Sequence, residues 1–308
     1  MSPVIDSILP IFAVIALGSF LKRFAFIDEH FIRVSDRLIY FIFFPLLLFW
    51  EIGKPTETVL FNWLFVAGVL FSVFCVFGFS LIVAKLVRMP DREIGSYSQA
   101  CYRFNSYIGI AVILTVLGEN GVKEFGVLIG FVIPFINILA VSSLIAYSER
   151  NDSQEQQWSI ILKSVVTNPL IISCVLGVLY SNLGMPFPTF AEKILSTFSM
   201  LTLPLALICI GGSLTFSKFR EHFTYSSIAA FCKLLVLPAI GYLVLKQLHL
   251  TDTAFRVGMI YFALPTSPQN YILSSQLDSD VDLATSTIVL STILSIFSLS
   301  AILLLFAN

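Results

Sequence analysis

The sequence has few charged residues and no long polar segment between its apolar stretches. Charged residues make up 12% of the 308 residues, against roughly 25% in soluble domains, and the mean hydropathy is +0.92. Apolar runs of about 20 residues, the length that crosses a bilayer, follow one another along the chain. Because a soluble fold of this size could not bury so much apolar surface, we expect an all-α polytopic protein of the cell membrane, such as a bacterial inner membrane.

The sequence also lacks clusters of basic residues and cysteines at the spacings typical of metal ligands. The formal net charge is −1, which argues against a nucleic-acid partner. The five cysteines lie within apolar segments and lack metal-ligand spacing, so we expect neither a metal site nor a disulfide. Three histidines are scattered at span ends. The acidic loop of Asp278, Asp280 and Asp282 lacks EF-hand spacing and glycine, so we interpret it as a solvated turn.

Catalytic and cofactor motifs are not recognisable. We find no catalytic triad, phosphate loop or metal set, and we therefore expect a protein that is not an enzyme and needs no cofactor. The first apolar segment contains Asp6 and lacks a basic flank before it. We therefore interpret this segment as a retained helix, not a cleaved signal.

Ten transmembrane spans are predicted, with short connections. The longest polar connection, 148–157, lies at mid-chain and separates a first five-helix repeat (1–150) from a second (151–308). The spans cover about 4–21, 32–50, 62–86, 93–117, 122–147, 158–181, 190–213, 224–246, 253–276 and 283–306.

The distribution of Lys and Arg sets the expected orientation. With the N-terminus outside, eleven of these residues fall in inside loops and five in outside loops, which by the positive-inside rule places both termini on the outer face. Two remain within spans, Arg103 and Lys233. The eleven are Lys22, Arg23, Arg33, Arg37, Lys85, Arg88, Arg92, Arg150, Lys163, Lys218 and Arg220; the five are Lys54, Lys123, Lys193, Lys246 and Arg256.

The two halves share a pattern of proline and glycine at nearly constant separation. Since five spans is an odd number, the second copy enters the membrane from the opposite side, as in inverted-repeat transporters. The matches are Pro10 with Pro169, Gly18 with Gly177 and Pro45 with Pro204, all 159 residues apart, then Gly95 with Gly258 at 163 and Tyr107 with Tyr271 at 164.

The ninth span contains two prolines three residues apart, Pro265 and Pro268, followed by hydrogen-bonding side chains. Proline cannot continue a helix, and an interrupted helix within a membrane is tolerated only where its backbone faces protein or a water-filled cavity. The repeat pairs this stretch with 101–109 in the fourth span, which has no proline. We expect both spans to be broken and to cross near mid-membrane.

Several motifs are spread over nearly the whole chain: Asn168-Pro169-Leu170, Leu203-Pro204-Leu205, Pro134 with Asn137, and Leu264-Pro265-Thr266-Ser267-Pro268 with Asn270-Tyr271. Together they resemble the auxin efflux carrier family, in its small prokaryotic form. The resemblance implies two inverted five-helix repeats with crossing broken helices 4 and 9. It also implies a scaffold of helices 1, 2, 6 and 7 beside a mobile domain of helices 3–5 and 8–10, an elevator-like movement, and often a homodimer. Family members often carry a proline at the first break; Phe104-Asn105-Ser106 stands here, so a milder break is expected.

Arg103 and Lys233 lie near mid-membrane by their distance from the span ends, and intramembrane cations are functional hypotheses by default. The alternative is a structural pairing with helix-end carbonyls or snorkelling. We expect no Asp or Glu at comparable depth, since Asp6, Glu51, Glu119 and the acidic residues of 278–282 fall near span ends. A guanidinium suits a carboxylate, so we expect a small organic anion, a mono- or dicarboxylate, as substrate.

The candidate substrate-binding residues are those of the two breaks, with Asn137 and Lys233 as secondary candidates. Their amides could instead only satisfy unwound backbone. The set is Arg103, Asn105, Ser106, Tyr107, Pro265, Thr266, Ser267, Pro268, Gln269 and Asn270.

Two other functions stay open. A sodium-coupled symporter of the bile-acid type resembles the same ten-helix plan, although missing mid-membrane carboxylates weigh against it. An intramembrane enzyme would need a catalytic constellation, and a membrane sensor would need an extramembrane output domain. The sequence shows neither.

Overall fold

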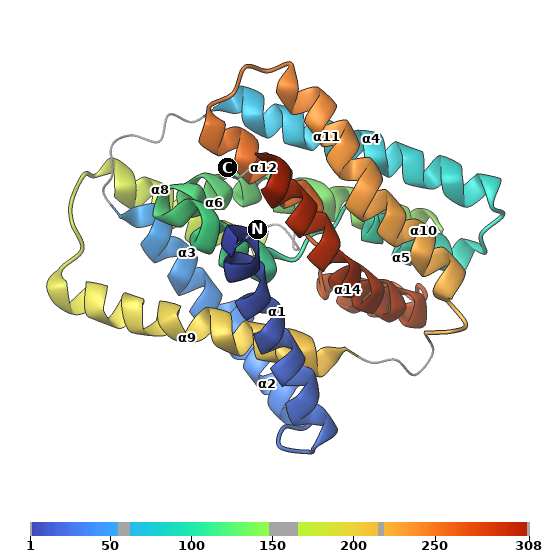
Figure 1. Ribbon diagram of the computed structural model, residues 1–308, viewed down its shortest axis with the longest axis horizontal. Helices are drawn as coiled ribbons and strands as arrows, with labels where there is room; N and C mark the ends of the chain where they lie inside the picture. The colour runs from blue at the N-terminus through green and yellow to red at the C-terminus, as the bar shows by residue number, and fades with distance from the viewer. Residues whose placement is uncertain (1, 55–61, 148–165, 215–218, 307–308) are drawn as a thin grey trace.

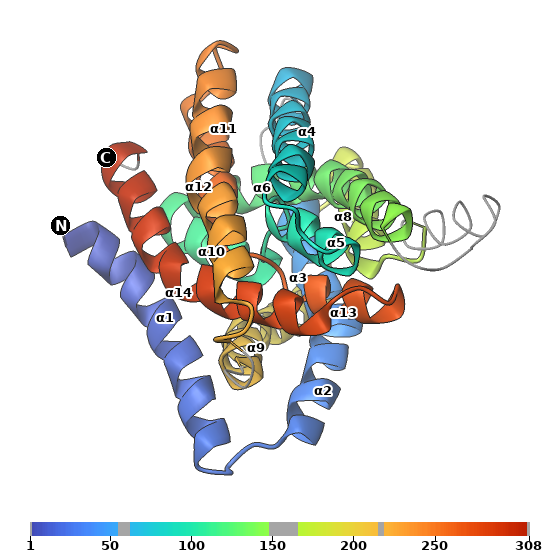
Figure 2. The same ribbon diagram turned by 90° about the vertical axis from the view of Figure 1, so that its right-hand side faces the viewer.

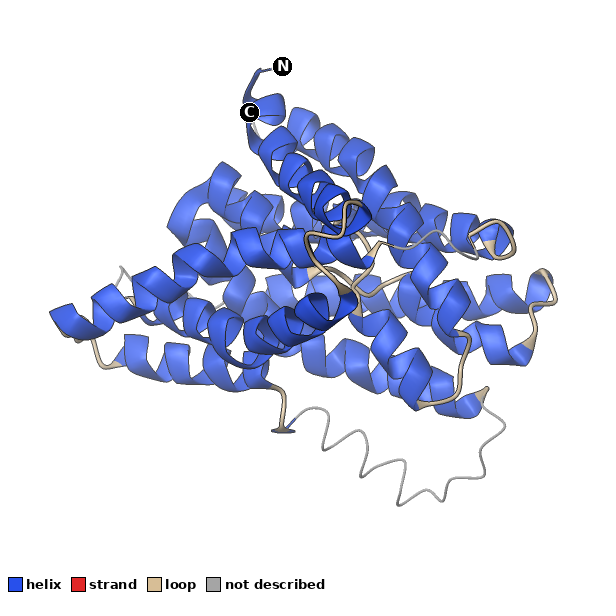
Figure 3. Ribbon diagram, turned by 90° about the horizontal axis from the view of Figure 1, so that it is seen from below, coloured by secondary structure: helices blue, strands red, loops and turns tan. Residues whose placement is uncertain are grey.

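The computed structural model describes residues 2–54, 62–147, 166–214 and 219–306. Every regular element within these ranges is a helix (Figure 3). The polar connection 148–157, with the proposed repeat boundary, and the start of the sixth predicted span lie outside the described residues. In chain order the elements are α1 (Ser2–Arg23), α2 (Glu29–Leu38), the π-helical η1 (Ile39–Phe43), α3 (Phe44–Gly53), α4 (Trp63–Leu86), α5 (Asp91–Ala100), α6 (Ser106–Ala146), α8 (Pro169–Asn182), α9 (Thr189–Ser213), α10 (Phe223–Phe231), the π-helical η2 (Cys232–Val236), α11 (Leu237–Lys246), α12 (Asp252–Ala263), α13 (Gln269–Gln276) and α14 (Val281–Phe306).

Five of the described helical stretches are long and apolar enough to cross a membrane: 63–86, 106–146, 189–213, 223–246 and 281–306. The stretch 169–182 is a shorter apolar helix. The predicted spans 93–117 and 253–276 are each divided between two helices. The longest stretch, α6, is divided at Gly118, whose φ of 65° and ψ of −159° are not helical. Glycine adopts such a conformation without strain, and it falls between the predicted fourth and fifth spans.

Prolines explain the two π-helical segments. Pro45 follows η1 and Pro238 follows η2 by two residues each. Proline has no N–H to donate, so it frees a carbonyl in the preceding turn, and π-helical turns are one way in which helices absorb such a defect. In η2 the Oγ of Ser298 donates to the carbonyl of Leu234 at 3.2 Å, which is the carbonyl that Pro238 leaves without its helical donor.

The two helix breaks lie where the sequence predicts them. Helix α5 ends at Ala100 and α6 begins at Ser106, while α12 ends at Ala263 and α13 begins at Gln269. The first break was expected to be milder because it lacks proline, but it is as long as the second. Asn105 explains how a full break forms without proline. Its side chain accepts hydrogen bonds from the N–H groups of Tyr107 and Ile108 and so begins a new helix.

Close backbone packing joins the helices at one end of the molecule. Helix α1 packs along α9, and α3 packs along α8. In Figures 1 and 2 the connection between α1 and α2 lies at the bottom of the molecule, and α4 lies beside α11 at the top. A Cβ on Gly18 would collide with the carbonyl oxygen of Ile208, and a Cβ on Gly211 with that of Ile15. Glycine at these positions lets the two backbones approach, as small residues do in membrane helix pairs.

We predict that Gly211→Ala destabilises the protein by about 1–3 kcal/mol, the usual cost of overpacking, because the added methyl meets backbone and not a movable side chain. Gly78→Ala is the matched control, since a Cβ there meets nothing within 4 Å. Thermal unfolding of both variants in detergent checks the prediction. A Gly211→Ala protein as stable as Gly78→Ala would contradict it.

Candidate functional site

The two breaks meet and hold each other through backbone groups. The N–H of Asn105 donates to the carbonyl of Pro265 at 2.9 Å. In return, the Oγ1 of Thr266 donates to the carbonyl of Ala100, the last residue of α5, at 2.9 Å. Each break therefore satisfies a polar backbone group that the other leaves free, which an apolar interior requires.

Arg103 lies within the first break and is 1% exposed. Its Nη1 donates to Oε1 of Gln269, at the start of α13, at 3.0 Å. Its Nη2 donates to Oδ1 of Asn137, in the second half of α6. Three elements that are far apart in the sequence therefore converge on one guanidinium.

The partners of this guanidinium are neutral. Within the described residues Arg103 forms no ion pair with a carboxylate, and its Nε is buried without a hydrogen-bond partner. Amide oxygens orient the cation but do not neutralise it, and burying an uncompensated charge is costly. The arrangement is therefore suited to bind a negatively charged group.

Asn105 presents a second unused donor beside Arg103. Its Oδ1 is occupied at the N-terminus of α6, whereas its Nδ2 is buried without a partner in the described part of the chain. Of the two residues that follow, Ser106 is the first residue of α6 and half-buried, and Tyr107 packs edge-on against Phe44 at 4.6 Å between ring centroids. The first break thus supplies two buried donors from positions two residues apart.

Most polar side chains of the second break form hydrogen bonds within the protein. Thr266 also donates its N–H to Oγ of Ser291, and Oγ of Ser267 accepts from the N–H of Gln269. Nδ2 of Asn270 donates to the carbonyl of Ser96 at 3.2 Å. Pro268 is the N-cap residue of α13. Of the second break and the start of α13, Gln269 is the residue that the described structure shows hydrogen-bonded to Arg103.

Lys233 lies apart from this group. Its Nζ donates to the carbonyl of Phe262, near the end of α12, at 3.0 Å, and it sits 5.8 Å from the ring centroid of Tyr261. These contacts match the structural alternative, a pairing with helix-end carbonyls. The secondary candidate Asn137, in contrast, is a direct partner of Arg103.

Two residues near the site were missed in the sequence. Tyr40, in η1, lies close enough to interact with both Arg103 and Gln269. Asp36, in α2, lies near Cys209 and Tyr107, although Arg103 does not pair with it. Asp36 falls four residues into the predicted span 32–50, so a count of carboxylates within span limits would have found it. Nothing in the sequence marks Tyr40.

Comparison with known proteins identifies the class. A family model described as membrane transport protein matches residues 3–303. An uncharacterized transporter of Methanothermobacter thermautotrophicus is 24% identical over 302 residues, covering 96% of this chain and 95% of the relative. An uncharacterized transporter of Methanocaldococcus jannaschii is 21% identical over 298 residues, covering 94% and 95%.

The match runs over nearly the whole chain and agrees with the several apolar helices long enough to span a bilayer. A multi-pass membrane protein of this class has the lipid bilayer and a small-molecule substrate as its partners. The chain belongs to the membrane transport protein family of the auxin efflux carriers.

Proposed function

We propose that this transporter carries a small organic anion, a mono- or dicarboxylate, and binds its anionic group at Arg103. The observation that carries the proposal is a fully buried guanidinium at the meeting point of two broken helices, held by two amide oxygens and by no carboxylate of the described residues. Nε of Arg103 and Nδ2 of Asn105 are the donors still available. Charge-assisted hydrogen bonds to such donors are about twice as strong as neutral ones.

We further propose ten transmembrane helices in two inverted repeats. The breaks support this arrangement, because α5 and α12 end, and α6 and α13 begin, 163 residues apart in each case. A packing contact is repeated as well: Gly18 meets the carbonyl of Ile208, and a Cβ on Gly177 would lie 3.3 Å from that of Phe49. Gly18 and Gly177 are 159 residues apart, and so are Phe49 and Ile208. The glycine comes from the first half of the chain in one contact and from the second half in the other, as two-fold symmetry requires.

The way in which the helices group supports an elevator-like movement, which we propose as the mechanism. Helices α1, α3, α8 and α9 pack with one another, and the helices that bear the breaks pack with α4, α11 and α14. The long helix α6 also packs against α1, α3 and α8, so it forms much of the contact between the two groups. We assign the first group, with α2, to the scaffold (helices 1, 2, 6 and 7) and the second to the transport domain (helices 3–5 and 8–10). Arg103 belongs to the second group, so the substrate would move with it.

A sodium-coupled carrier of the bile-acid type is the alternative within transport. Sodium would need oxygen ligands at the breaks. The carbonyls of Ala100, Phe262 and Pro265 each accept one hydrogen bond and keep a second lone pair. Oε1 of Gln99, near the end of α5, is buried without a partner in the described residues. The free polar atoms of Arg103 and Asn105 are donors, which repel a cation. At Arg103 itself, these donors favour an anion over a metal cation as the bound species, whatever ion supplies the driving force.

We predict that Arg103→Ala abolishes the thermal stabilisation that organic anions give to the wild-type protein, and that Arg103→Lys weakens it because lysine lacks the planar fork. The loss should correspond to roughly 1.5–3 kcal/mol of binding free energy. The measurement is a thermal-shift screen of purified protein against mono- and dicarboxylates, with neutral and cationic analogues alongside, because a ligand of the native state raises the melting temperature. The best ligand is then tested in uptake.

Two variants act as controls for that prediction. Asn105→Asp keeps the acceptor that caps α6 but replaces the free donor by a negative charge, so it should fold and lose anion binding. Lys233→Met removes a cation of similar burial that has a structural role, so it should reduce stability and spare anion affinity. If a folded Arg103→Ala protein bound anions as tightly as the wild type does, the proposed function would be wrong.

The proposed topology places both termini on the outer face. A reporter that is active only in the cytoplasm, fused after Asn308, should therefore be silent, and the same reporter in the 148–157 connection should be active. The physical reason is the excess of Lys and Arg on the predicted inner side. The reverse pattern would show the opposite orientation.

We also propose a homodimer formed through the scaffold. The exposed face of α2 and η1 carries a shallow groove of about 360 Å³, lined by Val34, Arg37, Leu38, Phe41 and Ile42. We expect cysteines introduced at Leu38 or Phe41 to cross-link two copies in native membranes, whereas one at the exposed Phe74 of α4 should not. If only the cysteine at position 74 cross-linked two copies, the dimer contacts would lie in the proposed transport domain and the proposal would be wrong.

A further inference from the structure

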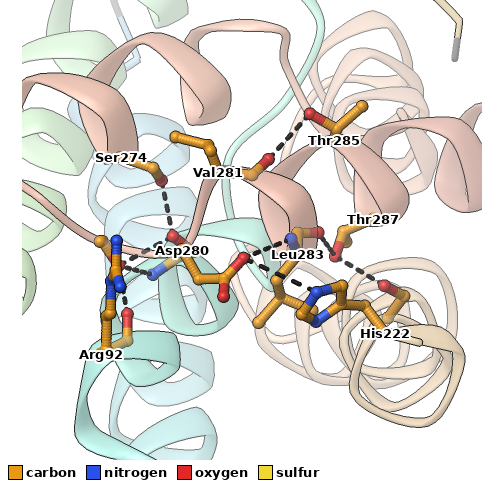
Figure 4. A network of polar contacts seen from close by, with 11 residues as sticks. Arg92, His222, Ser274, Asp280, Val281, Leu283, Thr285 and Thr287 are labelled. Atoms are coloured by element: carbon orange, nitrogen blue, oxygen red, sulfur yellow. Dashed lines mark hydrogen bonds and ion pairs between the residues drawn. The ribbon is translucent and has the colours of Figure 1, made fainter. Parts of the chain in front are cut away.

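A cluster of three metal-ligating side chains lies away from Arg103, at the ends of three helices. Glu93 is in the first turn of α5, His222 is the N-cap residue of α10, and Asp280 immediately precedes α14. One ligand atom from each lies within 4.8 Å of the other two, and Nε2 of His222 is 4.0 Å from Oδ1 of Asp280. In Figure 4 the carboxylate of Asp280 points at the imidazole of His222.

The backbone fixes the two carboxylates close together. The carbonyl of Arg92 accepts from the N–H of Asp280 at 3.1 Å and from Oγ of Ser279 at 2.7 Å, which ties the start of α5 to the loop before α14 (Figure 4). Oδ1 of Asp280 also accepts from the N–H of Leu283 at 2.7 Å. Asp280 therefore cannot move away from Glu93 without losing its own hydrogen bonds.

Such a pair of carboxylates needs a positive partner. Like charges held together raise the free energy of the folded state, and Oε2 of Glu93 is buried without a hydrogen-bond partner in the described residues. The imidazole of His222 supplies a charge only when it is protonated. The side chains of His222 and Asp280 are 15% and 21% exposed, so solvent compensates them only in part.

We propose that Glu93, His222 and Asp280 bind a divalent transition-metal ion of the zinc type. One imidazole and two carboxylates suit zinc, manganese or iron, whereas calcium and magnesium prefer sites made of oxygen alone. Metal–ligand bonds of about 2.0–2.2 Å require ligand atoms roughly 3–3.5 Å apart, so binding would draw the three side chains closer than the 4.8 Å within which their ligand atoms now lie. Three protein ligands leave a coordination position for water.

The bound ion would tie the first half of the chain to the second. Glu93 lies on α5, while His222 and Asp280 belong to elements more than a hundred residues later. All three elements fall in the proposed transport domain, so the ion would stabilise that group of helices without linking it to the scaffold. We therefore infer a stabilising site that is independent of the substrate.

The experiment uses the full chain, purified with a tag that lacks histidine and stripped with a chelator. Zinc sulfate should raise its melting temperature in a saturable way, and magnesium or calcium at equal concentration should not. Glu93→Gln, His222→Gln and Asp280→Asn should each weaken the apparent zinc affinity at least about tenfold, since even residues beyond the ligands cost ten- to a hundredfold. Asparagine at position 280 retains the helix cap.

Matched controls separate this site from general metal binding. Asp91→Asn removes an exposed carboxylate from the same turn as Glu93, and His30→Gln removes an exposed histidine; both should respond to zinc as the wild type does. Without zinc, Glu93→Gln should melt at or above the wild-type temperature, because it relieves repulsion. Absorption by Co²⁺ in the wild-type protein, displaced by zinc, gives a second readout that needs no variant. An equal zinc response in all variants and controls, or no saturable response in the wild type, would overturn the proposal.

Discussion

The structure depends on one constraint: polar backbone groups freed inside an apolar interior must find partners. Each of the two breaks exposes helix ends, and the partners come largely from the opposite break. Asn105 donates to Pro265, Thr266 donates to Ala100, and Lys233 donates to Phe262. The same contacts that satisfy the backbone bring Arg103 against Gln269, so the geometry of the site is a consequence of this exchange.

Much of the architecture could be predicted from local chemistry. Pro265 and Pro268 predict the second break directly, and the 163-residue offset transfers the prediction to a stretch without proline. The role of Asn105 was harder to see, because asparagine could serve as a ligand or as a cap. In the structure Oδ1 caps the helix, while Nδ2 has no hydrogen-bond partner among the described residues.

Long-range contacts could not be predicted in the same way. The partners of Arg103 lie 34 and 166 residues away, and no spacing rule connects them. Tyr40 belongs to the π-helical segment η1 and lies near Arg103 and Gln269. A π-helical turn changes the direction in which the following side chains point, and a hydropathy pattern does not predict such a turn. Glu93 lies at the start of a predicted span, and His222 and Asp280 lie near the ends of others, so nothing in the sequence relates them. Only the packing of three helix ends brings them together.

The two buried cations differ in their partners and not in their burial. Arg103 and Lys233 are almost equally buried, at 1% and 0% exposure. Lys233 meets a helix-end carbonyl, whose partial negative charge compensates it, and the adjacent Tyr261 ring adds a favourable face. Arg103 meets side-chain amides, which orient the guanidinium but do not neutralise it, and its Nε has no hydrogen-bond partner in the described part of the chain. The difference therefore lies in the partners, and it is the neutral, incomplete shell around Arg103 that marks it as the place where an anion would be stabilised.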